Sequence, residues 1–358
     1  MFLALRDLRF ARGRFSLIVA VVALMTLLVG FLTGLTGGLS MQNISALTRL
    51  DAPSVVFSMP DGGSPSFSTS TLTKEQEERW AQADGIRSVT PLGISSAALE
   101  SGTGQSASSE AVVLMAAPPG SPTDAPDAGI TLGRSTADAL GVRPGDTVAL
   151  AGTDLTVHEV IDDQHYSHRT VAWTTLDEWH ALQAATRAPD TYATVLLVDG
   201  APADTAALDA SAGTTSTSLL QSLLALDAFR SEFGSLALMI GMLVLIATLV
   251  IGVFFLVWSM QRQRDIAVLK ALGATTGALA RDAVAQALIV LVAGTGIGVL
   301  ATLGLGVLAA QALPFALNAV LLLGPAVAMI AAGLLGALVS VRLITRVEPT
   351  LALQAAAA

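Results

Sequence analysis

The stretch GSLALMIGMLVLIATLVIGVFFLVW, residues 234–258, sets the architecture of this protein because its 25 residues include no charged side chain. A helix that crosses a bilayer needs about 20 consecutive apolar residues. A surface helix of a soluble domain would instead carry a polar face. The stretch therefore predicts a transmembrane helix.

Three more windows have this character, Phe15 to Leu35, Ala283 to Ala310 and Asn318 to Val341. Basic residues precede the first window, as they would in a signal peptide, but its apolar run exceeds the roughly 7–15 residues of a signal core. We interpret it as an uncleaved anchor. The expected fold is an α-helical membrane protein with four transmembrane helices, one before and three after a large domain.

Composition excludes several classes of protein. Charged residues make up 13% of the 358 residues and hydrophobic residues 53%, whereas globular domains carry about 25% charged residues. The net charge of −9 argues against a nucleic-acid partner. The absence of cysteine excludes disulfides, thiolate metal sites and a cysteine nucleophile. Neither Lys74 nor Lys270 follows a glycine, so the chain has no G-x-x-x-x-G-K phosphate loop.

The distribution of charge predicts how the chain is oriented. Residues 1–15, 259–283 and 342–358 carry ten basic and four acidic residues, whereas residues 16–258 carry nine basic and 24 acidic residues. Basic segments stay on the cytoplasmic side. We expect a multi-pass protein of the cell membrane, with both termini in the cytoplasm and the acidic domain outside.

These patterns define the expected boundaries. They are a cytoplasmic amphipathic helix at 1–14, spans at 15–35, 234–258, 283–310 and 318–341, an extracellular domain at 36–233, a cytoplasmic coupling region at 259–282, an extracellular loop at 311–317 and a cytoplasmic tail at 342–358.

The domain at 36–233 has a mixed α+β pattern. Helical stalks are expected at Thr36 to Arg49 and Thr217 to Phe233, where leucines recur at helical spacing. Short segments rich in β-branched residues predict strands at 54–58, 110–116, 147–151, 156–161, 170–173 and 193–198. Short helices are expected at 136–140 and 176–183.

The connection between the second and third spans contains the most specific motif. It reads RQRDIAVLKALGAT at residues 262–275, and the tail reads RVEPTLAL at residues 346–353. The first motif resembles R-x-x-E-I-A-x-L-K-A-L-G-A of the FtsX/MacB-like ABC permeases, with Asp265 in place of the commoner Glu. The tail resembles R-[IV]-x-P-x-x-A-L of the same family, although Leu351 precedes Ala352. The segment 135–146 is similar to part of the family's external domain.

The resemblance implies a permease that has no ATP site or catalytic residue of its own. It would work as a homodimer with two copies of a separate ABC ATPase, which binds the ATP and Mg²⁺, and would transmit force to the external domain (mechanotransmission). The residues that would couple to the ATPase are Arg262, Arg264, Asp265, Lys270, Leu272, Gly273, Glu348 and Pro349. A short charged helix that ends at a glycine is suited to docking in a partner.

The N-terminal segment 2–10 and residues 31–39 resemble the heme-exporting permeases of Gram-positive bacteria. This narrower resemblance implies heme as the substrate. Heme needs an apolar pocket, an axial ligand and a cation for its propionates. Candidate contacts at the outer ends of the first two spans are Phe31, Met41, Asn43, Arg230, Glu232, Met239 and Met242. Methionines packed in the helices and charges facing lipid head groups remain the simpler interpretation.

Two other patterns admit two interpretations each. Gly30, Gly34 and Gly38 have the small-x-x-x-small spacing that permits close contact of helices, and we expect them at a dimer interface. His165 and His168 follow Asp162 and Asp163, which could make a metal or heme ligand cluster, but a polar external loop is favoured. We therefore expect no metal site.

Alternative functions share the same scaffold. The permease could regulate an extracellular cell-wall hydrolase by ATP-driven motion, or export a lipoprotein or a peptide. A membrane-anchored enzyme is a more distant alternative, because no G-x-S-x-G motif is present.

Overall fold

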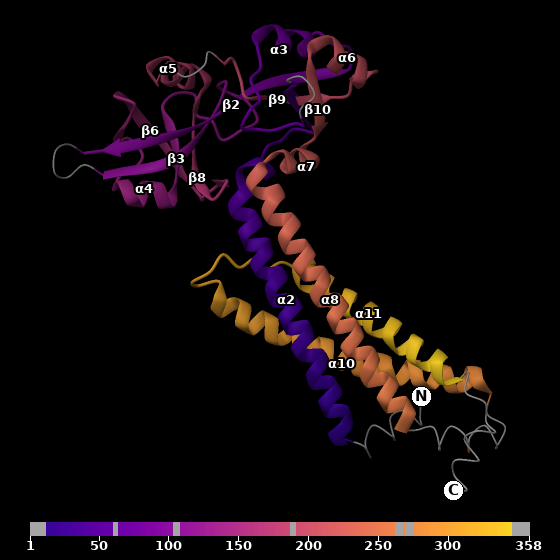
Figure 1. Ribbon diagram of the computed structural model, residues 1–358. Coiled ribbons are helices and arrows are strands. Elements are labelled where there is room, and N and C mark those ends of the chain that lie inside the picture. The colour runs from indigo at the N-terminus through magenta and orange to yellow at the C-terminus, as the bar shows by residue number, and fades with distance from the viewer. Residues whose placement is uncertain are drawn as a thin grey trace. The chain divides into compact units, whose positions relative to one another are not determined.

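The computed structural model describes residues 12–59, 64–102, 108–186, 191–261, 268 and 275–345. The chain divides into two units. The membrane unit consists of residues 1–38 and 234–358, and the large domain consists of residues 39–233. Figure 1 shows the elements of both units.

Long apolar helices form the membrane unit. The helices are α2 (Arg12–Thr48), α8 (Asp227–Gln261), α10 (Thr276–Ala309) and α11 (Ala319–Thr345). Each is long and apolar enough to cross a membrane, over Phe15–Thr48, Asp227–Trp258, Ala280–Ala309 and Ala319–Val339. In hydrocarbon every backbone polar group must bond within its own segment, which a helix achieves. The first two helices also run into the large domain, α2 through its last residues and α8 through its first.

The interior of the membrane unit is built from side chains of all four helices. Val22 of α2, Ile251 of α8, Leu291 of α10 and Met329 of α11 belong to one buried cluster. Small residues let the backbones approach: a Cβ on Gly336 would lie 3.0 Å from the Cα of Gly252. Van der Waals packing of this kind drives helix association in lipid.

The three glycines expected at a dimer interface contact the same chain instead. A Cβ on Gly30 would meet Thr302, one on Gly34 would meet the ring of Phe315, and one on Gly38 would lie 1.7 Å from the carbonyl oxygen of Pro314. Their small size therefore serves packing within the protomer. This packing lends no support to the dimer-interface prediction, which stays a prediction.

An open sheet forms one part of the large domain. Its strands, in spatial order, are β10 (Thr214–Ser218), β1 (Ser54–Ser58), β9 (Val195–Gly200) and the first half of β2 (Ile86–Ser101), all antiparallel to their neighbours. Helices α3 (Lys74–Ala81) and α6 (Thr205–Ala212) accompany this sheet (Figure 1). Trp80 and Ala212 from these helices are buried with Val56, Leu196 and Val198 of the sheet.

The second half of β2 enters a closed barrel. Around the ring, β2 pairs with β3 (Ser108–Ala117), then come β8 (Arg169–Thr175), β4 (Ile130–Gly133), β6 (Thr153–Ile161) and β5 (Thr147–Leu150). The ring closes where Leu99 of β2 pairs with Leu150 of β5. Helices α4 (Arg134–Leu140) and α5 (Leu176–Thr186) contribute Leu140 and Trp179 to the barrel's buried cluster. The predicted fold class, four spans with an α+β domain between the first and the second, is confirmed.

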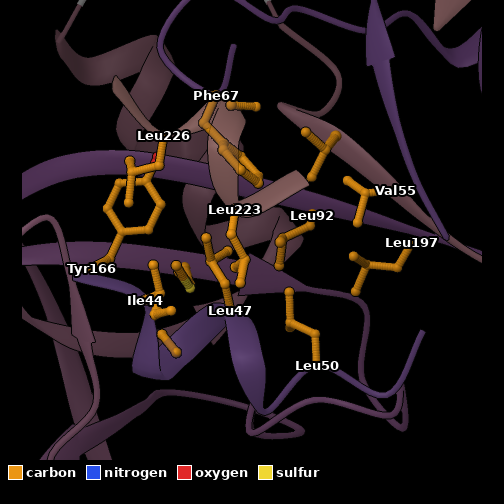
Figure 2. Close-up of a cluster of buried hydrophobic side chains, with 14 of the residues drawn as sticks. Ile44, Leu47, Leu50, Val55, Phe67, Leu92, Tyr166, Leu197, Leu223 and Leu226 are labelled. Atoms are coloured by element: carbon orange, nitrogen blue, oxygen red, sulfur yellow. The ribbon is translucent and has the colours of Figure 1, made fainter. Parts of the chain in front are cut away.

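A third buried cluster joins the helical stalks to the strands. Figure 2 shows Ile44 and Leu47 near the end of α2, and Leu50 just after it, among side chains of the open sheet, together with Leu223, Leu226 and Tyr166. Val171 and Trp173 of the barrel strand β8 belong to the same cluster. The end of α2 is therefore part of the core of the large domain.

The predicted single helix from Thr217 to Phe233 is wrong. The chain forms the end of β10, the short helices α7 (Leu219–Ser222) and η2 (Leu223–Ala225), and an extended residue, Leu226, before α8 begins. The break lets Leu223 and Leu226 turn into the core, while Leu220 and Leu224 stay exposed. Helical spacing alone does not show which leucines a core will accept. Local sequence patterns also gave no indication of α3, α6, β2, β4, β10 or the short strand β7 (His165–Tyr166).

Replacing Gly38 by alanine should destabilise the membrane unit, because the new Cβ would collide with the backbone at Pro314. Overpacking of this kind costs about 1–3 kcal/mol. We expect a lower melting temperature for Gly38→Ala in the full chain, measured in one detergent. Gly241→Ala is the control, since a Cβ there meets nothing within 4 Å. Equal melting temperatures for the two variants would contradict the predicted contact.

Candidate functional site

A tight turn of the large domain docks on the stalk helix α2. Strand β7 (His165–Tyr166) pairs with the start of β8, and the two residues between them, Ser167 and His168, have φ angles of 52° and 62°. Two such residues in a two-residue hairpin are typical of a type I′ turn. Positive φ is uncommon outside glycine, so this conformation needs support from its surroundings.

Backbone hydrogen bonds from α2 provide that support. The N–H of Ser167 donates to the carbonyl oxygen of Asn43 at 3.0 Å, and the N–H of His168 donates to that of Gln42 at 2.9 Å. The N–H of His165 donates to the hydroxyl of Ser45 at 2.8 Å. Three N–H donors of the hairpin region thus bind within a single turn of helix α2, although about 120 residues separate the partners in sequence.

Three side chains meet beside this turn. Asn43 is fully buried, and its Nδ2 donates to Oε2 of Glu232 and lies 3.0 Å from Nε2 of His168. Nε2 of His168 lies 3.1 Å from Oε2 of Glu232, which makes an ion pair when the imidazole is protonated. We call Asn43, His168 and Glu232 the stalk cluster. It joins α2, the β7–β8 turn and the first turns of α8.

The stalk cluster is partly open to solvent. The side chains of His168 and Glu232 are 42% and 28% exposed. The Oδ1 atom of Asn43 is buried, and it has no hydrogen-bond partner among the described residues. A buried polar atom without a partner costs free energy. The hydrogen bond that Nδ2 of the same side chain donates to Glu232 offsets part of this cost.

The structure separates the predicted histidine and aspartate cluster. Asp162 pairs with Arg134 at 3.1 Å, and Asp163 accepts the N–H of Ser135 at 2.9 Å, so both carboxylates bind the region of α4. No group of three or more His, Cys, Asp or Glu side chains suited to a metal occurs in the part of the chain that the structure describes. His165 and His168 belong to a hairpin docked on α2 rather than to a free loop.

Burial changes the chemistry of His165. It lowers the pKa of this imidazole, an effect that the nearby Asp163 carboxylate opposes and His168 reinforces. The side chain is therefore held toward its neutral form in the folded domain.

The predicted heme contacts are distributed over both units. In the large domain, Asn43 meets Glu232, while Arg230 is exposed and pairs with Asp227 at 3.0 Å, and Met41 is 46% exposed. These residues do not form one pocket among the described contacts. His168 was missed as a partner of Asn43 and Glu232, because nothing local in the sequence indicates that a turn 125 residues away meets α2.

The remaining candidates lie in the membrane unit. The ring of Phe31 packs 4.9 Å from that of Phe315. Met239 and Met242 are 50% and 54% exposed on α8. All eight residues predicted to couple to an ATPase fall outside the described residues.

The four apolar helices make this chain a membrane protein. Residues 237–349 match the family model described as FtsX-like permease C-terminal. This match covers most of α8 and all of α10 and α11, and it includes the 262–275 motif. Over residues 237–349 the match supports the predicted resemblance to FtsX-like permeases.

Two solved structures are similar to part of the chain. One is the periplasmic region of MacB from Actinobacillus actinomycetemcomitans, with 13% identity, coverage of 50% of this chain and 94% of that chain, and a TM-score of 0.35. The other is the extracellular domain of the noncanonic ABC-type transporter YknZ from Gram-positive bacteria, with 14% identity, coverage of 48% and 91%, and a TM-score of 0.31.

The lowered pKa of His165 predicts a loss of stability in acid. The unfolded imidazole has a pKa of about 6.5, so as pH falls below that value the unfolded chain takes up the proton first. We expect the melting temperature of the full chain to fall between pH 7.5 and 5.5, and to fall less steeply in His165→Gln. The exposed His158 supplies the control variant, His158→Gln. The same slope in His165→Gln and wild type would refute the assignment.

Proposed function

We propose that the protein is the permease subunit of an ABC exporter, driven by a separate ATPase. The match of residues 237–349 to the FtsX-like permease C-terminal family carries this proposal. The absence of a G-x-x-x-x-G-K motif from the sequence agrees with an ATP site on another chain. Two copies of the permease would associate with two copies of the ATPase, and the segments 262–273 and 348–349 would contact it.

Force would pass through the helices. Both α2 and α8 contain residues of the membrane unit and of the large domain without interruption. ATP binding would close the ATPase subunits, displace the coupling segment and shift these helices, so that the motion reaches the large domain outside the cell. The acidic balance of residues 16–258 supports that orientation.

Heme is the substrate that we favour. Its expulsion from the membrane would protect the cell from heme toxicity. The supporting observation is the contact between Asn43 and Glu232, two of the residues selected for heme, at the domain end of α2 and α8. A carboxylate such as that of Glu232 can bind the iron. Arg230 supplies a cation for a propionate.

A titration with heme tests the substrate. We expect a saturable Soret shift with the purified full chain, and ATPase activity that changes with heme when the cognate ATPase is added. Glu232→Gln should weaken heme binding at least tenfold, whereas Glu159→Gln, a change on strand β6, should not.

No saturable shift and no response of the ATPase would exclude heme. The permease assignment would stand, and the substrate would be a lipoprotein or a peptide, or the partner would be an extracellular cell-wall hydrolase. One observation favours a docking role of this last kind: Leu220 and Leu224 of the large domain are 76% and 47% exposed. Exposed apolar side chains on the neighbouring short helices α7 and η2 are suited to contact with another protein.

The proposed role of the coupling region, residues 259–282, leads to a separate prediction. Lys270→Glu reverses a charge in the motif that resembles the ATPase contact of the family, so the cognate ATPase should no longer copurify. Arg281→Glu makes the same change outside the 262–275 motif and should retain the ATPase. Retention by both variants, or loss by both, would contradict the assigned role of the motif.

A further inference from the structure

The chain enters and leaves the large domain through the open sheet. Helix α2 leads into β1, and β10 leads through α7 into α8. Strands β1 and β10 are neighbours in that sheet. Either stalk helix can therefore transmit a movement to the open sheet directly through the polypeptide backbone.

The barrel has no such route. Its strands β3, β4, β5, β6 and β8 all lie in the chain between β2 and β9, so none of them directly follows or precedes a stalk helix. The shared strand β2 connects it to the open sheet from the side. A second connection to the stalks would have to be made by contacts between distant parts of the sequence.

The β7–β8 turn makes such a connection. Strand β8 is a barrel strand with β3 and β4 as neighbours, and His168 directly precedes it. The turn binds α2 through the backbone bonds to Gln42 and Asn43, and it reaches α8 through the contact of His168 with Glu232. Tyr166, next to the turn, is buried in the same cluster as Ile44 and Leu47 of α2 (Figure 2).

His168 holds a particular place in this connection. Its single atom Nε2 lies within 3.1 Å of both stalk helices, at Asn43 of α2 and at Glu232 of α8. Its backbone has a positive φ that residues other than glycine seldom adopt. The docking contacts to α2 and α8 support this conformation.

We propose that His168 is a positioning residue that latches the barrel to both stalk helices, so that movement of the stalks is transmitted to the barrel. This inference rests on the proposed function, because it assigns a path to the ATP-driven motion. Without the latch the stalks would still move the open sheet, and the barrel, held only by the apolar contacts of Val171 and Trp173 and by the shared strand β2, would follow less closely.

Hydrogen exchange of the full chain in lipid nanodiscs, with its cognate ATPase, tests the latch. In the wild type we expect slow exchange at the amides of Ser167 and His168, and an effect of ATP on both the open sheet and the barrel strands β4 and β6. In His168→Ala, exchange at the two turn amides should rise at least tenfold. The ATP effect on the barrel should weaken clearly, while that on the open sheet and the ATPase activity remain.

Two further variants and a control separate transmission from folding. His168→Gln restores an amide near the position of Nε2 and should recover the response of the barrel. Ser45→Ala loosens the same turn by removing the acceptor of the His165 N–H, and serves if His168→Ala fails to fold. His158→Ala removes an exposed histidine of β6 and should behave as the wild type.

Three results would overturn the latch: turn amides that stay protected in His168→Ala, a barrel that responds to ATP as strongly as in the wild type although the turn is released, or a wild-type barrel that ignores ATP while the open sheet responds. If neither part responds to ATP in the wild type, the proposed coupling to an ATPase fails, and the latch fails with it.

Discussion

The burial of the end of helix α2 in the large domain is the interaction on which the rest of the structure depends. Ile44 and Leu47 belong to an apolar helix and Leu50 directly follows it, yet all three lie in the core of a β-rich domain. Each such side chain contributes about 1.5–3 kcal/mol on burial. The helix therefore cannot move independently of the domain without exposing this surface, which makes it suited to carrying force.

Polar contacts add direction to this apolar joint. The hydrophobic cluster stabilises the stalk ends in proportion to the apolar area that is buried. This effect does not favour one orientation of the side chains over another. The stalk cluster, Asn43, His168 and Glu232, adds hydrogen bonds with defined geometry between three elements. Together they describe a domain whose two parts, the open sheet and the barrel, are each connected to the helices that come from the membrane.

Much of the fold could be predicted because bilayer helices carry a strong local signal. Uncharged runs located all four helices, and strand β1 has the expected bounds Ser54–Ser58. The segment after β10 was predicted wrongly because its leucines fit a helix, whereas the core accepts Leu223 and Leu226 and leaves Leu220 exposed. The long strand β2 was missed because it passes from an open sheet into a barrel, and its surroundings change along its length.

The sequence by itself determined the membrane class, the layout of one helix before and three after the domain, and the resemblance of residues 237–349 to FtsX-like permeases, because apolar runs and the 262–275 motif are local properties. It also selected Asn43 and Glu232. Only the tertiary structure decided that these two meet, that His168 joins them, and that Gly30, Gly34 and Gly38 pack against their own chain. The reason is physical: contacts between distant parts of the sequence depend on how whole helices and strands pack against one another, and no local pattern records that packing.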